Sequence, residues 1–590
     1  MKFKRKLLVT ALLSITTFAV QAHDEVAAHP ACTQITVFTA KKFYTMNPGH
    51  PQARAVAVCN GQIVALGDSL DELKDWTDKI PTTIDNRFAE KTVFPGFIEA
   101  HSHPLLGAIT ANLPAIASLD TPQAYGPDIK GVKSEAEAFE RMRRYEAEMK
   151  DPSTPVLIWG WDVPMMGRHL TRQDLDKIST TRPVLVWDAS QHHGYVNSAL
   201  IERRKIPNDI KIPGVGHDDK GELNGQFLGV PAASYVILPL LGSKLAPAEA
   251  SRLMRWLIDL NRRNGITTTT DHSMGIFNID AEAGLLNAMF NNPNTPQRLM
   301  AIPAMHSFVA KYGSPEKAIE AVHALQDKST DRLIYHGIKF FADDSFNGLT
   351  FKPGGPGYID GTTGIWITPP EKMVAALEPW WKDGQQIFMH SIGVEAQDAT
   401  LAALRQLQAK SPRVDHRFTF EHVGMARYDQ IRAMKALGAS ANVNLYYIWL
   451  RGESYPKVLG RDRAEELSPV GSLVREGVPT TFHSDYPVAP PKPLLGITLG
   501  LTRVGQSGGK TLGPDQRINL QQALRMITID AAYVLGIDNK VGSIEPGKLA
   551  DFTVLEKDPH DVRPAAIRDI PVWGTVLGGR VFPTSEIVKP

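Results

Sequence analysis

Cysteine, net charge and long apolar runs are all scarce in this chain of 590 residues. Two cysteines are too few for a disulfide-stapled fold or for a zinc site built from cysteine. Lys and Arg number 64 against 63 Asp and Glu, so the charge balance indicates no surface for nucleic acid. With 43% hydrophobic and 22% charged residues, the composition excludes a disordered or collagen-like chain.

The first 22 residues have the pattern of a secretory signal peptide. Basic residues within 1–6 precede an apolar run over 7–20, and the small-residue pattern Val20-Gln21-Ala22 follows. An uncleaved membrane anchor is the alternative, but the run is shorter than the ~20 residues that a span requires. Cleavage would leave a net charge of about −3 and an exported protein, periplasmic or secreted, with no stable membrane insertion.

Both ends of the mature chain are rich in short strand-like runs. Asn60-Gly61 and Gly578-Gly579 are hairpin turn signals between such runs. The simplest assembly is one small β-sandwich built from residues 33–92 and 538–585.

Cys32 and Cys59 fall on neighbouring candidate strands of this unit. In an oxidising compartment they can form a disulfide. The alternative is a pair of buried thiols.

Eight apolar runs alternate with amphipathic helical patterns in the middle of the chain, at residues 92–103, 265–271, 298–306, 336–343, 386–391, 417–423, 439–445 and 478–485. Alternation of this kind is typical of a parallel α/β sheet, and eight strands predict a (β/α)8 TIM-like barrel over residues 93–537. The first gap holds about 160 residues, too many for one crossover. An inserted subdomain is therefore expected over residues 110–260.

Metal-binding residue types gather at the carboxyl ends of these runs, where barrel active sites lie. His101 and His103 are two residues apart and share a strand face, which makes them a chelating pair for zinc. His-x-His alone is a weak motif. However, His390, His422 and Asp485 end the fifth, sixth and eighth runs. We expect all five side chains to converge at the mouth of the barrel.

Lys339 lies inside the fourth run, on an otherwise apolar strand. A buried ammonium beside metal cations is unfavourable. Reaction with carbon dioxide would convert it to a carbamate, an anion that can bridge two metals. The alternative is a lysine paired with Asp343 or Asp344 at the rim.

Several motifs together resemble the metal-dependent amidohydrolase superfamily, and within it the amidohydrolase-3 group that includes N-substituted formamide deformylases. The matching segments are residues 95–103, 175–184, 190–198, 339–345, 390–393, 417–422, 484–487 and 542–552. Four positions depart from the pattern of this group, namely Gln191, Asp344, Val394-Glu395 and His483. None of the departures removes an expected ligand, but they lie near the expected pocket and leave the substrate class open.

The resemblance implies a role for each site residue. His101 and His103 would hold the more buried of two divalent metals, His390 and His422 would hold the second, and carbamylated Lys339 would bridge them. Asp485 would bind the first metal and act as general base and then acid. Zinc suits the imidazole and oxygen donors, with iron, manganese or cobalt as alternatives. A pair of ions ~3.5–4 Å apart lowers the pKa of a bridging water towards ~7.

The insertion supplies further candidates. His192, and with it Tyr195, is expected to steady the oxyanion or orient the substrate, with a structural contact inside the insertion as the alternative. Trp161 from a lid-like segment and Tyr446 after the seventh run are expected to line an apolar pocket, the core of the subdomain being the alternative for Trp161.

The leading hypothesis is hydrolysis of a non-peptide C–N bond in a small-molecule amide, an N-acyl or N-formyl amine. The same site would also suit a cyclic amide, a carbamate, a lactone or the terminal amide of a short peptide. A hypothesis from another class is a non-catalytic relative that binds a small molecule. A homodimer is compatible with the fold, and no motif decides the oligomeric state.

Overall fold

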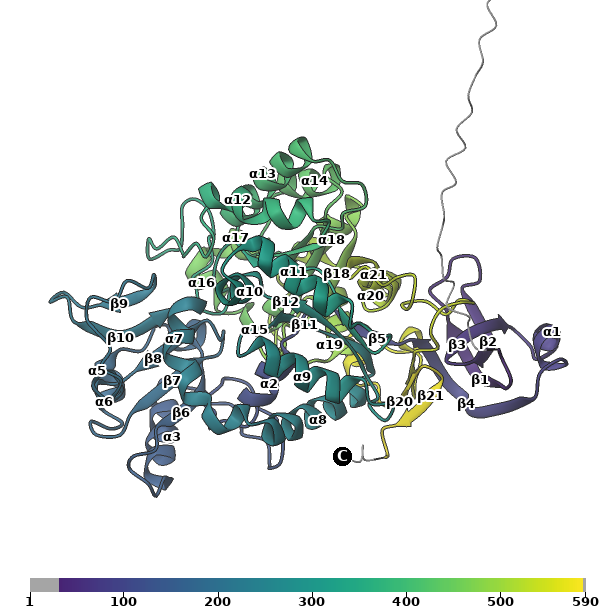
Figure 1. The fold of residues 1–590 in the computed structure, drawn as a ribbon, viewed down its shortest axis with the longest axis horizontal. Helices are drawn as coiled ribbons and strands as arrows, with labels where there is room; N and C mark the ends of the chain where they lie inside the picture. Colours follow the sequence, from purple (N-terminus) through teal and green to yellow (C-terminus); the bar gives the residue numbers. More distant parts are fainter. Residues whose placement is uncertain (1–30, 587–590) are drawn as a thin grey trace, which may run out of the picture.

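A computed structural model describes residues 31–586 of the chain (Figure 1). The predicted signal peptide at residues 1–22 lies outside the described residues. Within the part that is described, no helix combines the length and the apolar character needed to cross a membrane.

Strands from both ends of the chain form one seven-stranded sheet, in the order β21-β20-β19-β4-β1-β2-β3. Its members are β1 (Ile35–Tyr44), β2 (Gln52–Cys59), β3 (Gln62–Gly67), β4 (Thr82–Pro95), β19 (Phe552–Leu555), β20 (Val572–Leu577) and β21 (Arg580–Pro583). Both termini contribute strands, as expected. The backbone hydrogen bonds nevertheless join all seven strands into one sheet rather than into two stacked sheets. The reason is the length of β4, which pairs with β1 on one side and with β19 on the other.

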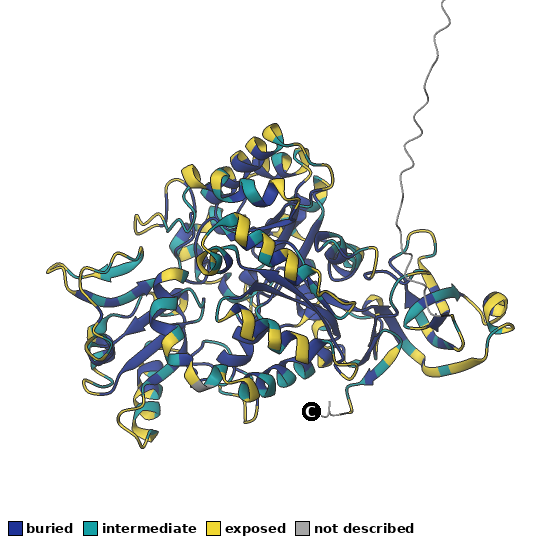
Figure 2. Ribbon diagram, in the orientation of Figure 1, coloured by how far each residue is buried: buried dark blue, intermediate teal, exposed yellow. Residues whose placement is uncertain are grey.

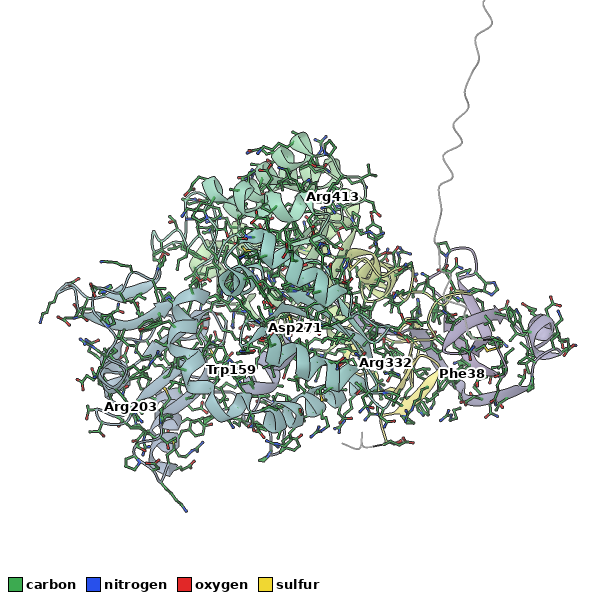
Figure 3. All side chains as sticks on the ribbon, viewed as in Figure 1. Phe38, Trp159, Arg203, Asp271, Arg332 and Arg413 are labelled. Carbon is green, nitrogen blue, oxygen red and sulfur yellow. A yellow bond between two sulfur atoms is a disulfide. The ribbon has the colours of Figure 1, made fainter. Side chains whose placement is uncertain are left out.

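An aromatic cluster lies in the buried core that the strands of this terminal sheet form. Phe38, labelled in Figure 3, stacks on Phe88 with ring centres 5.6 Å apart and meets the edge of Phe552 at 6.1 Å. Cys32 and Cys59 form a disulfide, as predicted, with Cα atoms 5.9 Å apart. The covalent link fastens the start of the described chain to the end of β2.

The centre of the molecule holds two parallel sheets, in the orders β13-β12-β11-β5 and β14-β15-β16-β17-β18. The first sheet consists of β5 (Phe97–Glu99), β11 (Ile266–Met274), β12 (Arg298–Pro303) and β13 (Leu333–Tyr335). The second consists of β14 (Ile338–Phe341), β15 (Ile387–Ser391), β16 (Thr419–His422), β17 (Ser440–Asn444) and β18 (Thr480–His483). Each of the eight predicted runs contains one of these strands, and β13 is an additional short strand.

The two central sheets meet at both of their edges. An isolated parallel bridge joins Ala304 after β12 to Lys339 in β14, and a second joins Ser102 after β5 to Tyr486 after β18. The residues that follow β5 and β18 are thereby brought side by side. This places the His101 and Asp485 motifs next to each other although 384 positions separate them in the sequence.

Helices surround the central strands and bury them on their outer face (Figures 1 and 2). They include α2 (Pro104–Thr110), α8 (Pro247–Arg263), α9 (Ile279–Phe290), α10 (Met305–Tyr312), α11 (Pro315–Gln326), α12 (Pro370–Lys382), α13 (Val394–Lys410), α14 (Tyr428–Ala436), α15 (Tyr446–Arg451), α18 (Val470–Arg475), α19 (Pro493–Thr502), α20 (Leu520–Met526) and α21 (Ile529–Val534). The helix α8 illustrates the pattern, since Leu253, Leu257 and their neighbours are buried while Arg263 faces solvent. Strands covered in this way are apolar on both faces and read as continuous hydrophobic runs.

The segment between α2 and α8 forms a separate five-stranded sheet, in the order β6-β7-β8-β10-β9. Its strands are β6 (Val156–Trp161), β7 (Val184–Asp188), β8 (His193–Val196), β9 (Val215–His217) and β10 (Leu223–Leu228). The accompanying helices are α3 (Glu135–Glu148), α4 (Val163–Met166), α5 (Arg172–Asp176), α6 (Ser198–Arg203) and α7 (Val230–Leu241). These elements fall within the predicted insertion at 110–260, and they lie beside the central sheets on the side away from the terminal sheet (Figure 1).

Candidate metal centre

A cavity of about 330 Å³ opens at the carboxyl ends of the central strands. Five of the residues singled out from the sequence line it: His103, Lys339, His390, His422 and Asp485. His192 from the insertion completes the lining on another side. The cavity therefore gathers residues from β14, β15 and β16, from the segments that follow β5 and β18, and from the insertion.

His101, His103 and Asp485 form one of the close groups of possible metal ligands beside this cavity. Asp485 Oδ1 lies 3.5 Å from His101 Nε2 and 3.3 Å from His103 Nε2, and Asp485 Oδ2 lies 3.6 Å from His422 Nδ1. The backbone N–H of Asp485 donates to the carbonyl of His101. Burial alone would raise the pKa of Asp485, but His103, together with His483 and Lys339, outweighs it and lowers that pKa to about 2. Asp485 is therefore a carboxylate at neutral pH, as a ligand or a base must be.

Glu421 holds the ring of His101 in place. His101 Nδ1 lies 2.5 Å from Glu421 Oε2, and the amide of Asn442 donates to the same carboxyl at 2.9 Å. His101 Nε2 is buried without a hydrogen-bond partner. A histidine whose one nitrogen donates to a carboxylate while the other is free is the usual arrangement of a metal ligand. Burial also raises the pKa of Glu421 to about 8, so its charged form needs a cation nearby.

His390 on β15 and His422 on β16 are neighbours, with ring centres 4.5 Å apart. His390 Nε2 is 3.0 Å from the backbone carbonyl of Asp344, which leaves Nδ1 free. Burial holds the pKa of both histidines well below the usual range. Both are neutral imidazoles, the form that binds metals.

Lys339 is 1% exposed, and its Nζ has no hydrogen-bond partner among the described residues. Burial lowers the pKa of this amine to about 8. The rim pairing considered above is absent, because Asp343 accepts backbone N–H groups of Lys352, Ile392 and Gly393 instead. A buried amine without a partner is costly, so the position of Lys339 calls for an explanation.

Asp344 joins the two adjacent histidines of the insertion to the central strands. Asp344 Oδ1 lies 2.6 Å from His192 Nδ1, and Asp344 Oδ2 lies 3.2 Å from His193 Nε2. His193 Nδ1 lies 3.2 Å from Asp188. Burial would lower the pKa of His193, but Asp188 and Asp344 outweigh it and raise that pKa to about 10. Asp344, one of the four departures from the motif pattern, thus holds His192 at the cavity wall.

Three residues of the centre were not assigned a role from the sequence: Glu421, His272 and His483. Strand alternation predicts Glu421 on the face opposite His422, but His422 has φ of +73°, so alternation fails at the end of β16. The predicted second run ends at Asp271, labelled in Figure 3, whereas β11 continues to Met274. His272 lies in this continuation, and its ring stacks on that of His101 with ring centres 4.0 Å apart.

The predicted pocket residues Trp161, Tyr195 and Tyr446 do not line the cavity. The indole of Trp161 donates to the carbonyl of Arg168, and the hydroxyl of Tyr195 lies 2.8 Å from His169 Nδ1. The hydroxyl of Tyr446 donates to the carbonyl of Lys492. All three are core side chains of their own elements. For Trp161 this is the alternative considered above.

The apolar wall of the cavity comes from other elements. Its apolar side chains include Leu106, Trp187, Val230, Ile237, Leu238, Ile276, Phe277 and Phe341. Most belong to helix α7 and to the loop after β11. Sequence periodicity could not identify them, because apolar residues that line a cavity have the same spacing as core residues, and several of these also pack in the main core.

The parallel strands and the cluster of donors at their carboxyl ends define an α/β metal-binding enzyme. A model described as the amidohydrolase family matches residues 89–583, and the chain therefore belongs to the amidohydrolase family and is a hydrolase. The resemblance inferred from the motifs is thereby confirmed.

Two curated proteins illustrate the range of the relatives. The N-substituted formamide deformylase of Arthrobacter pascens is 25% identical over 91% of this chain and 96% of its own length. The protein LONG AFTER FAR-RED 3 of Arabidopsis thaliana is 24% identical over 91% of this chain and 89% of its own length.

A solved structure supports the fold. An uncharacterized metal-dependent hydrolase from Pyrococcus horikoshii OT3 superimposes with a TM-score of 0.67, at 20% identity, over 90% of this chain and 99% of that chain. The likeness is that of a TIM-barrel-like α/β fold.

Proposed function

We propose that this protein hydrolyses the non-peptide C–N bond of small N-acyl or N-formyl amines. The observation that carries the proposal is the group of His101, His103 and Asp485, with unpartnered buried nitrogens, at the base of a largely apolar cavity. The similarity to an N-substituted formamide deformylase favours the amide over the alternative bonds. In this proposal the two central sheets form one closed barrel from the eight predicted strands, with β13 as an additional short strand.

The proposed centre takes two divalent ions, with zinc as the best fit to imidazole and carboxylate donors. His101, His103 and Asp485 would hold one ion, and His390 and His422 the other. Lys339 would bridge them as a carbamate. The neutral Nζ would attack the carbon of carbon dioxide: the N–C bond forms, one C=O π bond gives its electron pair to oxygen, and the nitrogen loses one proton. The environment supports this step, because burial lowers the pKa of Lys339 to about 8 and makes the reactive neutral amine accessible near neutral pH.

Bound metal would supply the polarisation of the substrate carbonyl and lower the pKa of a water towards ~7. Asp485 then accepts the proton of the attacking water and passes it to the departing nitrogen, acting as base and then acid. His192 stands at the cavity wall with Nδ1 held by Asp344, so its Nε2 is oriented towards the substrate oxygen. The apolar wall excludes water and receives the hydrocarbon part of the substrate.

The test is a combined measurement of metal content and activity. Protein prepared with zinc and bicarbonate should carry close to two ions per chain and hydrolyse a panel of N-formyl and N-acyl amines. Lys339→Gln should lower the content to one ion or none.

Asp485→Asn separates the enzyme from a non-catalytic binder. Hydrolysis should fall ~10³-fold while most of the metal remains, because loss of a positioned general base typically costs 10²–10⁴-fold. A chain that takes up no metal, or a panel without turnover on the metal-loaded protein, would overturn the proposal.

The predicted signal peptide adds an expectation of export to the periplasm or the medium. Comparison of the amino-terminal residue of the mature protein with Ala22-His23 tests it, since cleavage at that bond is the expected result.

A further inference from the structure

His483 is a buried histidine whose two ring nitrogens have no hydrogen-bond partner among the described residues. It ends β18, two residues before Asp485, and is 1% exposed. Neither Nδ1 nor Nε2 reaches a hydrogen-bond partner, although the carbonyl of Asn442 is close enough to attract one ring N–H. Burial of polar atoms without partners is costly, so such a residue in a strand core needs an explanation.

The ring of His483 lies among the proposed metal ligands. Its centre is 4.6 Å from that of His101 and 5.0 Å from that of His422. One ligand nitrogen from each of these three histidines lies within 4.8 Å of the other two. The carboxylate of Asp485 and the side chains of Lys339 and His103 also act on it electrostatically. A cation bound at His101 Nε2 is therefore within reach of the imidazole of His483.

The other unassigned histidine of the centre has a different environment. His272 Nδ1 lies 3.0 Å from the hydroxyl of Thr270, and its Nε2 faces Glu421 at 3.6 Å. Its Nδ1 therefore has a hydroxyl partner, and its ring stacks on that of His101. By contrast, neither ring nitrogen of His483 is placed in a hydrogen bond with the described residues.

We propose that His483 is an additional ligand of the metal that His101 binds. This inference rests on the proposed function, because it concerns the same centre. A nitrogen donor from β18 beside Asp485 makes this metal site richer in imidazole than His101, His103 and Asp485 alone. An imidazole-rich site favours zinc, cobalt or nickel over magnesium and manganese. The unpartnered nitrogen is then satisfied in the loaded protein only.

The experiment compares wild type with His483→Leu, which cannot bind metal and has a similar volume. A matched control is His306→Leu, since His306 lines the same cavity but belongs to none of the groups that can hold a metal. Affinity is measured by chelator competition with zinc, and ligand number by the visible spectrum of the cobalt-loaded protein. Thermal unfolding is followed with and without metal.

Loss of a ligand should weaken zinc binding ~100-fold or more, beyond the 10–100-fold typical of residues outside the ligand shell. The cobalt spectrum of His483→Leu should change. Without metal the variant should unfold at or above the wild-type temperature, because no hydrogen bond is lost, whereas with metal it should unfold below it. A purely structural role would lower both temperatures. The control should match wild type in affinity and spectrum.

Equal affinity and an unchanged cobalt spectrum in His483→Leu would overturn this inference while leaving the proposed function intact. Absence of metal binding in the wild-type protein would instead refute the proposed function. If the leucine variant does not fold, the comparison is repeated with His483→Gln, which has a polar side chain. Zinc affinity and the cobalt spectrum of this variant then support or overturn the inference in the same way.

Discussion

His193 should be protonated at neutral pH and should stabilise the fold by several kcal/mol. It is fully buried, with Nδ1 3.2 Å from Asp188 and Nε2 3.2 Å from Asp344. These carboxylates overcome the effect of burial and raise the pKa of His193 to about 10. Replacement by glutamine leaves both carboxylates without their cation.

The magnitude follows from linkage between protonation and folding. A histidine with a pKa of about 10 when folded and about 6.5 when unfolded contributes about 4 kcal/mol at pH 7 and about 1.4 kcal/mol at pH 9. Since the folded pKa is raised, this stability is fully present below the unfolded pKa and is lost as the pH rises through the folded pKa. The pH 7 figure agrees with the roughly 3–5 kcal/mol measured when one partner of a buried ion pair is removed.

The assay is urea unfolding of wild type and His193→Gln at pH 7 and pH 9. The penalty of the substitution should shrink by about 2–3 kcal/mol between the two pH values. His217→Gln serves as the control, because His217 is an exposed histidine of the same insertion and should stay within about 0.5 kcal/mol of wild type. A penalty that is absent at pH 7, or that grows towards pH 9, would refute the assignment of a buried imidazolium.

Three further substitutions test other parts of the structure. Glu421→Gln should weaken metal binding about 10–100-fold by chelator competition, because it removes the carboxylate that orients His101, and unchanged affinity would contradict that role. Leu238→Asp should raise KM for apolar amides with little change in metal content, since it places a charge in the apolar wall; an unchanged KM would show that substrate binds elsewhere. Replacing both Cys32 and Cys59 by serine should lower the free energy of unfolding by about 3.5 kcal/mol, because the disulfide closes a loop with a sequence separation of 27, and should leave kcat/KM unchanged. Equal stability of the variant and wild type would mean that the disulfide does not stabilise the fold.

The central strands and most of the donor set could be predicted from the sequence. Each of the eight apolar runs contains a parallel strand, because strands covered by helices must be apolar on both faces. His101, His103, His390, His422 and Asp485 could be placed together since carboxyl ends of parallel strands share one edge. The family could be recognised for the same reason, as its motifs lie at those strand ends.

Contacts between segments that are distant in the sequence could not be predicted from the strand patterns. Glu421 and His422 are neighbours in sequence, and both reach the centre because the positive φ of His422 breaks the strand alternation. Asp344 meets His192 only because the inserted sheet docks beside the central strands. Trp161 looks like a pocket residue in the sequence, whereas packing commits its ring to the core of the insertion.

The sequence by itself determined the local patterns: apolar strand runs, the spacing of the metal-binding histidines, and strand-rich ends of the chain. Tertiary structure alone decided which side chains satisfy one another. Periodicity constrains the direction of a side chain relative to its own backbone, but the partner of a buried polar group is set by where a second segment lies. The position of His483 among the proposed metal ligands, with both ring nitrogens unpartnered in the described residues, is one of the features that only the tertiary structure decided.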